Sequence, residues 1–519
     1  MTALHPLTTQ GTHMNTALLV GAVAISLAIY AIGTIIYRLW LHPLAKVPGP
    51  KYMAVSDVPG QWISYINLDM VRQATVLHRK YGPIVRIGPD RLAIEGSISW
   101  PEVYGIRSTS DQDEFSKIPD FAIPNDHLAL LGANRENHRR QRRQMNHAFS
   151  SAALHEQEAV IMQYIDKFMD KITERAKRGE ALNIVDWLNF TTFDIIGDLA
   201  FADSFHSLDG DTTFVKNIFR GSIGTSYRRF LWQFPLLKLP LMMVIGAKEL
   251  AVATAAGKEN FKMGRLKGQA RMAMGAEPKD GRRDFATYML RKGKDGESVL
   301  SDEEVQTLSS VLVIAGSETT ATALSGFSFL ITTNLEKQQI LAEEIRSAFT
   351  DETDITLTGT GHLEYLNAVI EETLRLYPPA AALPPRVSPG AELHGLWVPR
   401  GTKIHVYQNA TNRNPDHFKD PDSFEPERWL NPNHPRYNPR FASDKKQLVK
   451  PFSNGPRDCI GKNLAYTEMR VIISRLLYRF DIELLPGQER WMSKQKSSFI
   501  WVKGPLEVKL KPRAGITLD

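Results

Sequence analysis

Residues 451–461 of the chain read PFSNGPRDCIG and contain its only cysteine, Cys459. After this stretch, apolar residues recur every three or four positions up to Phe480, which predicts one buried face of a helix. Cys459 is therefore expected at or just before a helix N-terminus, where the dipole and free N–H groups favour a thiolate over a thiol. The flanking glycines would let a bulky group approach the backbone, and Arg457 could pair with an anion.

Three interpretations of Cys459 are open at this point. The residue could be an inert member of the core, or it could be a nucleophile. A nucleophile needs a positioned general base, and His417 and His434 offer no recognisable pattern for one. The third interpretation is a metal ligand. One thiolate cannot build a zinc site, but it can be the sole protein ligand of a haem iron, because the porphyrin supplies the other donors.

Two other stretches place polar residues in unusual helical settings. AGSETTA, residues 315–321, lies in a long helical pattern, although glycine and two adjacent threonines are poor helix formers. A threonine hydroxyl there can bond back to the chain and loosen the local ladder of hydrogen bonds. EETLRLYPP, residues 371–379, puts Glu372 and Arg375 on one helix face, and PERW downstream supplies Arg428. Taken alone, each stretch also fits an ordinary helix surface.

Together with these stretches, the pattern F-x-x-G-x-R-x-C-x-G in residues 452–461 resembles the cytochrome P-450 haem-thiolate monooxygenases. The resemblance covers nearly the whole chain. HPLAKVPGPK, YGPIVRIGPD and TTFDIIGDLAF are most similar to fungal microsomal members that oxidise secondary metabolites. The resemblance implies the cytochrome P-450 fold, which is mainly α with a small β region. It also implies haem b (iron protoporphyrin IX) as cofactor, with the Cys459 thiolate as the axial ligand of the iron.

The resemblance further implies roles for residues around the haem. Phe452 would shield the thiolate, and Arg457 would pair with a haem propionate, because burying that charge requires a cation. The family commonly carries W-x-x-x-R in an upstream helix. His138 and Arg142 hold these spacings in NHRRQRRQ, with histidine in place of tryptophan, and Arg386 is a further candidate partner of the propionates.

The two other motifs acquire roles in the same way. Glu318 and Thr319 are the expected catalytic residues, relaying protons from solvent to the oxygen chemistry at the haem. Glu372, Arg375 and Arg428 are expected to form a buried ion-pair network that supports the cysteine loop and is costly to break.

Four residues that adjoin these motifs in the sequence are expected to have structural or surface roles. Trp429 stands where the family often has phenylalanine, and it should keep the packing role of that ring. Arg139, Arg140 and Arg143 are expected on an exposed basic face that could meet a reductase.

The substrate site is placed by the resemblance among four mostly apolar segments, which are the loop 121–131, the face 311–316, residues 380–383 and the turn 497–499. No charged anchor is evident among them, which favours a neutral lipophilic molecule such as a terpenoid or polyketide. The implied reaction inserts one oxygen atom from O₂ by hydroxylation or epoxidation. An NADPH-dependent flavoprotein reductase would supply electrons, and a b-type cytochrome is a second candidate donor.

Two other functions compete with this one. A haem-thiolate isomerase or dehydratase rearranges peroxides without a reductase. Such members tend to lose the acid–threonine pair, which is intact here as Glu318 and Thr319. A non-catalytic haem sensor or membrane scaffold would need no proton relay.

Residues 17–37 form an uncharged apolar run that is long enough to cross a membrane as a helix. A cleaved signal peptide is the alternative, but no Lys or Arg precedes the run, and Arg38 follows it at once. The basic residues after the run place the rest of the chain in the cytosol. The expected organisation, in the endoplasmic reticulum membrane, is a short lumenal tail (1–16), a single transmembrane anchor (17–37), a proline-rich linker (38–60) and a catalytic domain (61–519).

Composition sets the remaining limits. The 519 residues are 43% hydrophobic and 23% charged, which is typical of a globular protein, and a net charge of +6 is too mild to indicate nucleic acid as a partner. A lone cysteine excludes internal disulfides. Helical patterns over 153–175 and 302–330, a hairpin over 81–96 and a basic, solvated stretch over 257–284 complete the outline of a mainly α body.

Overall fold

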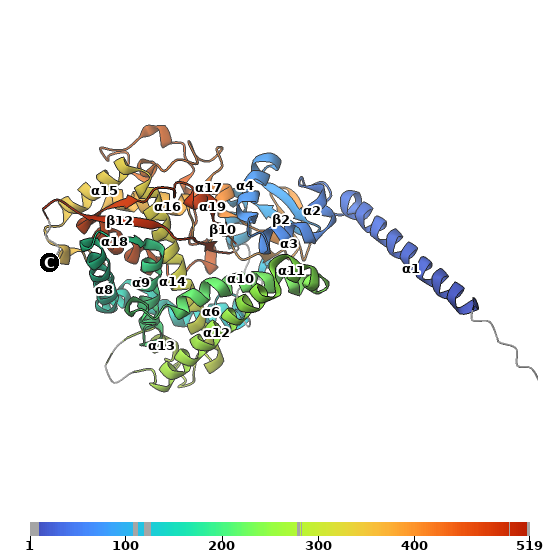
Figure 1. Cartoon of the computed structure of the whole chain (residues 1–519), viewed down its shortest axis with the longest axis horizontal. Helices are drawn as coiled ribbons and strands as arrows, with labels where there is room; N and C mark the ends of the chain where they lie inside the picture. Colours follow the sequence, from blue (N-terminus) through green and yellow to red (C-terminus); the bar gives the residue numbers. More distant parts are fainter. Residues whose placement is uncertain are drawn as a thin grey trace, which may run out of the picture.

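The computed structural model describes residues 10–106, 113–118, 126–277, 281, 283–497 and 499–515. Figure 1 shows one long helix, α1, projecting away from the body that the other labelled helices and strands form. The α-helices are α1 (Gln10–Ile36), α2 (Lys51–Val55), α3 (Asp57–Tyr65), α4 (Met70–Tyr81), α5 (Gly96–Ser99), α6 (Arg135–Met145), α7 (Ser151–Glu156), α8 (Glu158–Lys177), α9 (Ile184–Phe201), α10 (Thr213–Gln233), α11 (Lys238–Ile245), α12 (Ala247–Ala273), α13 (Phe285–Met289), α14 (Asp302–Thr332), α15 (Leu335–Ala348), α16 (Glu364–Leu376), α17 (Gln408–Asn412), α18 (Lys462–Arg479) and α19 (Trp491–Lys494).

The strands are short and belong to small sheets. They are β1 (Ile84–Gly88), β2 (Arg91–Ile94), β3 (Ser116–Lys117), β4 (Ala181–Asn183), β5 (Arg386–Val387), β6 (Ala391–Leu393), β7 (Leu396–Val398), β8 (Lys403–His405), β9 (Phe480–Leu484), β10 (Lys496–Ser497), β11 (Trp501–Val502) and β12 (Glu507–Pro512). The hairpin predicted over 81–96 is confirmed, because β1 and β2 pair antiparallel. β2 then pairs parallel with β8 in a sheet of order β1-β2-β8-β5-β3. The prediction of a mainly α protein with a small β region is confirmed.

The projecting helix agrees with the predicted anchor over 17–37. The most apolar 18-residue window within residues 16–41 has a mean hydropathy of 2.3, and none of that window is buried against the body. At a rise of about 1.5 Å per residue the segment 16–41 is long enough for the roughly 30 Å hydrocarbon core of a bilayer. Arg38, at its end, is tied to the body: its Nη1 donates to the Val55 carbonyl oxygen over 2.6 Å, and its own carbonyl accepts from Arg86 over 2.7 Å.

The expected linker over 38–60 is only partly extended. Residues 42–50 are non-helical, as their prolines predict, but α2 and α3 begin before residue 60. Met53 and Ala54 are buried, because α2 packs against β1 rather than standing free. The body of the protein therefore begins within the predicted linker.

The central helix of the body is α14, which confirms the helix predicted over 302–330. Its start is set by a capping box, in which the Ser301 hydroxyl accepts from the Glu304 N–H and the Glu304 carboxylate accepts from the Ser301 N–H. Glu304 also pairs with Arg140 of α6. Arg140 is therefore a structural ion-pair partner rather than part of a free basic face. α14 packs against α9, α12, α16 and α18 and buries most of its residues.

The helices α10 and α12 run side by side and meet at glycines (Figure 1). A Cβ atom at Gly224 would lie 2.3 Å from the Ala253 carbonyl oxygen, so any other residue there would push the helices apart. The close approach also brings the inward faces of both helices to one cavity, described below.

The basic stretch 257–284 is more buried than its charge predicts. α12 continues through it to Ala273, and Arg271 on that helix is 1% exposed. The Arg271 guanidinium donates to both carboxylate oxygens of Asp284, over 2.6 and 2.8 Å. The prediction of a solvated stretch holds at Lys258, Lys262 and Arg265, which are exposed. It fails at Arg271, because Asp284 supplies the counter-charge that burial requires.

Candidate active site

A cavity of about 650 Å³ lies between α14, the α10–α12 pair and the segment that carries Cys459. Its wall is mostly apolar. Val311, Ile314 and Ala315 of α14 line it, where substrate-facing residues were predicted. Other lining residues from the predicted segments are Leu130, Leu131, Ala380, Leu383 and Phe499. Residues 121–125 and Ser498, which the prediction also included, lie outside the described residues.

Cys459 lies three residues before the first residue of α18, as the apolar spacing predicts. Its N–H donates to the carbonyl oxygen of Phe452 over 2.9 Å, which closes the loop on itself. Gly455 in this loop has φ of 77°, and a Cβ there would lie 1.9 Å from the Tyr104 carbonyl oxygen. Only glycine fits this position, because both the backbone conformation and the close contact exclude a side chain.

The Cys459 sulphur opens into the cavity. Cys459 is a lining residue, and its side chain is exposed to that space. Burial raises the pKa of the Cys459 thiol, and a backbone hydrogen bond from Gly461 acts in the opposite direction. A cation that binds the sulphur would take the place of the proton, as metals do at cysteine ligands.

Two arginines are held beside the sulphur by the cysteine loop and its neighbours. Arg142 of α6 donates to the carbonyl and the carboxylate of Asp458, over 2.6 and 2.8 Å. Arg457 donates to Glu114 over 2.9 Å and to the Ala133 carbonyl over 2.7 Å. Both arginines line the cavity.

Arg386 and His138 add to this cluster of donors. Arg386 is buried, its Nη1 donates to the Phe115 carbonyl over 3.3 Å, and its Nε has no hydrogen-bond partner among the described residues. Burial lowers the pKa of Arg386, and the charge of Arg457 lowers it further. Burial lowers the pKa of His138 to about 3, with the surrounding cations acting in the same direction. His138 is therefore neutral at pH 7, and the structure brings all four predicted residues together.

The chemistry of this cluster fits a buried dianion such as the two propionates of haem. Arg142, Arg386 and Arg457 line one cavity, and the carboxylates that meet them there are Glu114 and Asp458. The Nε–H group of Arg386 is buried and has no acceptor among the described residues, so it can donate to a bound anion. A haem would place its carboxylates against these donors and its iron against Cys459.

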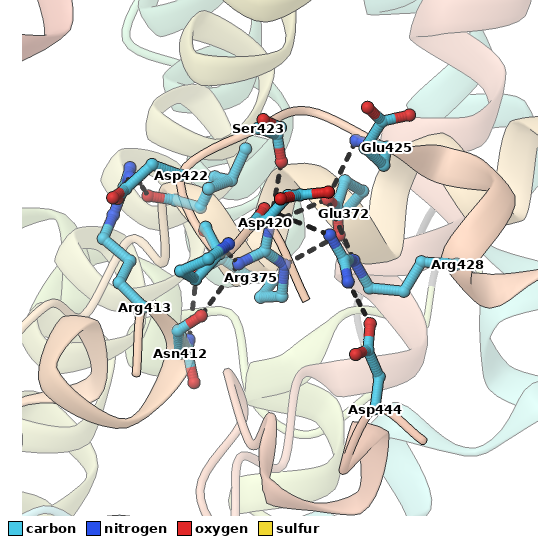
Figure 2. A network of polar contacts seen from close by, with 12 residues as sticks. Glu372, Arg375, Asn412, Arg413, Asp420, Asp422, Ser423, Glu425, Arg428 and Asp444 are labelled. Carbon is cyan, nitrogen blue, oxygen red and sulfur yellow. Dashed lines mark hydrogen bonds and ion pairs between the residues drawn. The ribbon is translucent and has the colours of Figure 1, made fainter. Parts of the chain in front are cut away.

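The predicted ion pairs among Glu372, Arg375 and Arg428 are present (Figure 2). Glu372 is fully buried and accepts from Arg375 over 2.7 and 2.8 Å. Arg428 donates to the same carboxylate over 3.3 Å and also pairs with Asp444. Burial alone would raise the pKa of Glu372, but the two arginines and the Glu425 N–H more than offset it, so this pKa lies below its usual value.

Trp429 belongs to this network, which its predicted packing role did not include. Its Nε1–H donates to the Glu372 carboxylate over 2.8 Å. A phenylalanine ring could fill the same space but could not make this bond. Glu372 thereby gains a neutral donor that satisfies a buried lone pair without adding charge.

The structure separates the two expected catalytic residues on α14. Thr319 lines the cavity, and its hydroxyl donates to the Ala315 carbonyl oxygen over 2.6 Å. Glu318 is fully buried and is turned to another partner, Lys503, which donates to its carboxylate over 2.5 Å and to Thr322 over 2.6 Å. Burial raises the pKa of Glu318 and lowers the pKa of Lys503. No sequence pattern marks Lys503, because it lies 185 residues from Glu318.

Glu468 is a second buried carboxyl that the sequence analysis did not single out. It is 2% exposed on α18, and burial raises its pKa to about 8, with a hydrogen bond to Thr320 acting in the opposite direction. Thr320 lines the cavity. The signal was available, because position 468 falls between Leu464 and Ile472 on the helix face predicted to be buried.

We expect Trp429→Phe to lower the free energy of unfolding by about 1.5–3 kcal/mol, the range for a hydrogen bond to a charged group. Urea denaturation of the detergent-solubilised protein measures the change. Trp397→Phe is the matched control, because Trp397 is 61% exposed. Equal effects of the two substitutions would contradict a specific bond to Glu372.

We expect Glu468 to make stability depend on pH. Its pKa is raised in the folded protein, so the folded state binds more protons than the unfolded state, and its contribution is lost as pH rises from about 4.5 to about 8. Glu468→Gln keeps the shape of the protonated acid and should remove this pH dependence. The thermal midpoint of the variant, relative to that of the natural protein, should therefore be higher at pH 8 than at pH 6. Parallel pH profiles would contradict the assignment.

Comparison with known proteins agrees with this site. The sequence profile of the family described as Cytochrome P450 matches residues 58–510. The cytochrome P450 monooxygenase astJ of Aspergillus oryzae is 39% identical over 92% of this chain and 94% of its own length. Averantin hydroxylase of Dothistroma septosporum is 37% identical over 94% of this chain and 90% of its own length, and trichothecene C-15 hydroxylase of Fusarium sporotrichioides is 34% identical over 93% and 96%. The chain therefore belongs to the cytochrome P450 family of haem-thiolate monooxygenases.

Proposed function

We propose that the protein is a membrane-anchored monooxygenase that inserts one oxygen atom from O₂ into a lipophilic small molecule, with haem b held by the Cys459 thiolate. The observation that carries the proposal is the position of the only cysteine of the chain, which opens into a large apolar cavity beside three arginines. When bound, haem supplies the dioxygen and electron-transfer chemistry that no amino-acid side chain provides.

The residues around Cys459 would hold and orient the cofactor. Arg142, Arg386 and Arg457 would bind its propionates, and neutral His138 would add a hydrogen bond in place of the tryptophan common in the family. Phe452 lines the cavity and packs against Tyr466 at 5.0 Å between ring centroids, which gives it a fixed position to shield the sulphur from water.

Thr319 and Glu318 would move protons in two stages. The Thr319 hydroxyl lies on the cavity wall, where it can exchange its bond to Ala315 for a water molecule. Burial raises the pKa of Glu318, which favours the protonated carboxyl. Because Lys503 binds this carboxylate, Glu318 would have to leave Lys503 and rotate toward the cavity before it could deliver that proton to Thr319.

The proposed setting is the endoplasmic reticulum membrane, with a single span and the catalytic domain on the cytosolic side. The length and exposure of α1 support a span, and the basic residues after it support the orientation. We propose a lumenal tail (1–16), an anchor (17–37) and a linker that starts at residue 38. The catalytic domain begins within the predicted linker (38–60), at α2, and continues through the predicted domain (61–519). An NADPH-dependent flavoprotein reductase would supply electrons, with a b-type cytochrome as a second donor.

Two of the relatives are named as hydroxylases, one of averantin and one of a trichothecene at C-15, and these names support hydroxylation in fungal secondary metabolism. The resemblance found in the sequence extends the proposal to epoxidation and to a terpenoid or polyketide substrate. A reductase-independent isomerase or dehydratase is less well supported, because Thr319 lies on the cavity wall with an acidic neighbour in sequence. A non-catalytic sensor would not need the large apolar cavity.

Cys459→Ala should abolish the red-shifted Soret band that the reduced protein forms with carbon monoxide, because the variant lacks the thiolate. The absorption spectrum of the purified protein, with haem content determined separately, makes the measurement. Ser453→Ala in the same loop is the control and should keep the band. A band that survives in Cys459→Ala would overturn the proposed ligand.

Thr319→Ala should uncouple NADPH consumption from product formation and release peroxide, with at least a several-fold loss of coupling. Ser328→Ala is the matched control, because Ser328 bonds back to the Leu324 carbonyl of the same helix but lies away from the cavity. Product formation and peroxide are measured together in the reconstituted system. Unchanged coupling in Thr319→Ala would remove Thr319 from the relay.

A further inference from the structure

The cavity carries a second basic group, which the proposed haem site does not use. Arg228 and Arg229 of α10 and Lys258 of α12 line the cavity, whereas the haem cluster comes from α6, β5 and the cysteine loop. The cations that lower the pKa of His138 are Arg457, Lys117, Arg142 and Arg386, and none of them lies on α10 or α12.

Arg228 is the half-buried member of this group, since Arg229 is buried and Lys258 is exposed. Its Nη2 atom is buried with no hydrogen-bond partner among the described residues. Burial raises the pKa of Tyr227, the residue before Arg228, and the charge of Glu249 on α12 raises it further. Both Glu249 and Arg228 are described, and they form no ion pair with each other. Arg229 differs, because it packs over the Tyr65 ring at 6.0 Å.

No carboxylate of the described cavity wall pairs with Arg228. The acidic side chain in the lining is that of Asp458, and it is bound to Arg142 beside Cys459. Asn260 of α12 also lines the cavity, is 9% exposed, and has an Oδ1 atom with no partner among the described residues. The wall formed by α10 and α12 therefore offers hydrogen-bonding groups that no described side chain or backbone group binds.

An arginine keeps its charge at every physiological pH, and a buried N–H without an acceptor costs free energy. A protein that only had to bind neutral hydrocarbons would gain by replacing it with an apolar residue. The planar guanidinium matches a carboxylate, which can accept two of its N–H groups at once. The rest of the wall is apolar and suits the carbon skeleton of the same molecule.

Building on the proposed monooxygenase function, we propose that the substrate is a lipophilic carboxylic acid whose carboxylate binds Arg228 on α10. Asn260 donates a hydrogen bond to a further oxygen atom of the same molecule, or accepts one from it. This replaces the neutral substrate expected from the sequence. Binding of the acid end to α10 leaves the carbon skeleton to occupy the apolar space along Val311, Ile314 and Ala315.

The test compares matched pairs of probes in the full-length, haem-loaded protein at pH 8, where the acids are ionised. The pairs are dodecanoic acid, dehydroabietic acid and naphthoic acid, each with its methyl ester. Equilibrium dialysis, corrected by detergent without protein, gives the ratio of acid to ester affinity for each pair. Arg228→Gln is the variant, and Arg220→Gln is the matched control, because Arg220 lies on the exposed face of the same helix.

We expect at least one acid to bind the natural protein roughly ten- to a hundredfold more tightly than its ester, the range for one charge-assisted hydrogen-bonded pair. Arg228→Gln should remove that preference, and Arg220→Gln should keep it. Esters that bind as well as acids, a preference that survives Arg228→Gln, or failure of every pair to bind would each overturn the proposal. The ratio in the natural protein decides the question even if the variant does not fold. Loss of the thiolate haem spectrum in the natural protein would instead count against the proposed function.

Discussion

The polar network shown in Figure 2 depends on the buried carboxylate of Glu372. Glu372 is fully buried and binds Arg375 from its own helix and Arg428 from a segment 56 residues later. Arg375 in turn donates to the carbonyls of Asn412, Pro421 and Ser423, so one ion pair joins α16 to an irregular stretch with few strands or helices of its own. Removing one member of such a group costs about 3–5 kcal/mol, because it leaves a buried charge without a partner.

The helix α14 is both a buried element of the core and part of the cavity wall. It buries most of its residues, yet it carries hydroxyl groups that weaken a helix in isolation. Several of these hydroxyls bond back to carbonyls of the preceding turn, including Ser317, Ser325 and Ser328, which satisfies them inside the core. Thr319 makes the same type of bond at the cavity wall, where a ligand or water can compete for it. The same chemistry therefore supports packing along most of the helix and reactivity at one turn.

Local sequence predicted those features that depend on neighbours within a few turns of the chain. The helix after Cys459, the hairpin over 81–96, the long helix from Asp302 and the pairing of Glu372 with Arg375 were all readable, because each needs only a period or a spacing. Features set by distant partners were missed. Trp429 was expected only to pack, and the partner that it binds lies 57 residues earlier. Arg140 was expected at the surface, but Glu304, 164 residues away, binds it.

By itself, the sequence determined the family, the mainly helical fold, the apolar N-terminal segment and the identity of the only possible thiolate ligand, because these rest on composition, periodicity and one specific motif. Only the tertiary structure decided which way the polar side chains point. It turned Glu318 away from the cavity toward Lys503. It also placed Arg228 on the cavity wall, with an Nη2 atom that binds none of the described residues. The physical reason is that a charged side chain takes the nearest partner that burial leaves available. Folding, and not the order of residues, decides which partner that is.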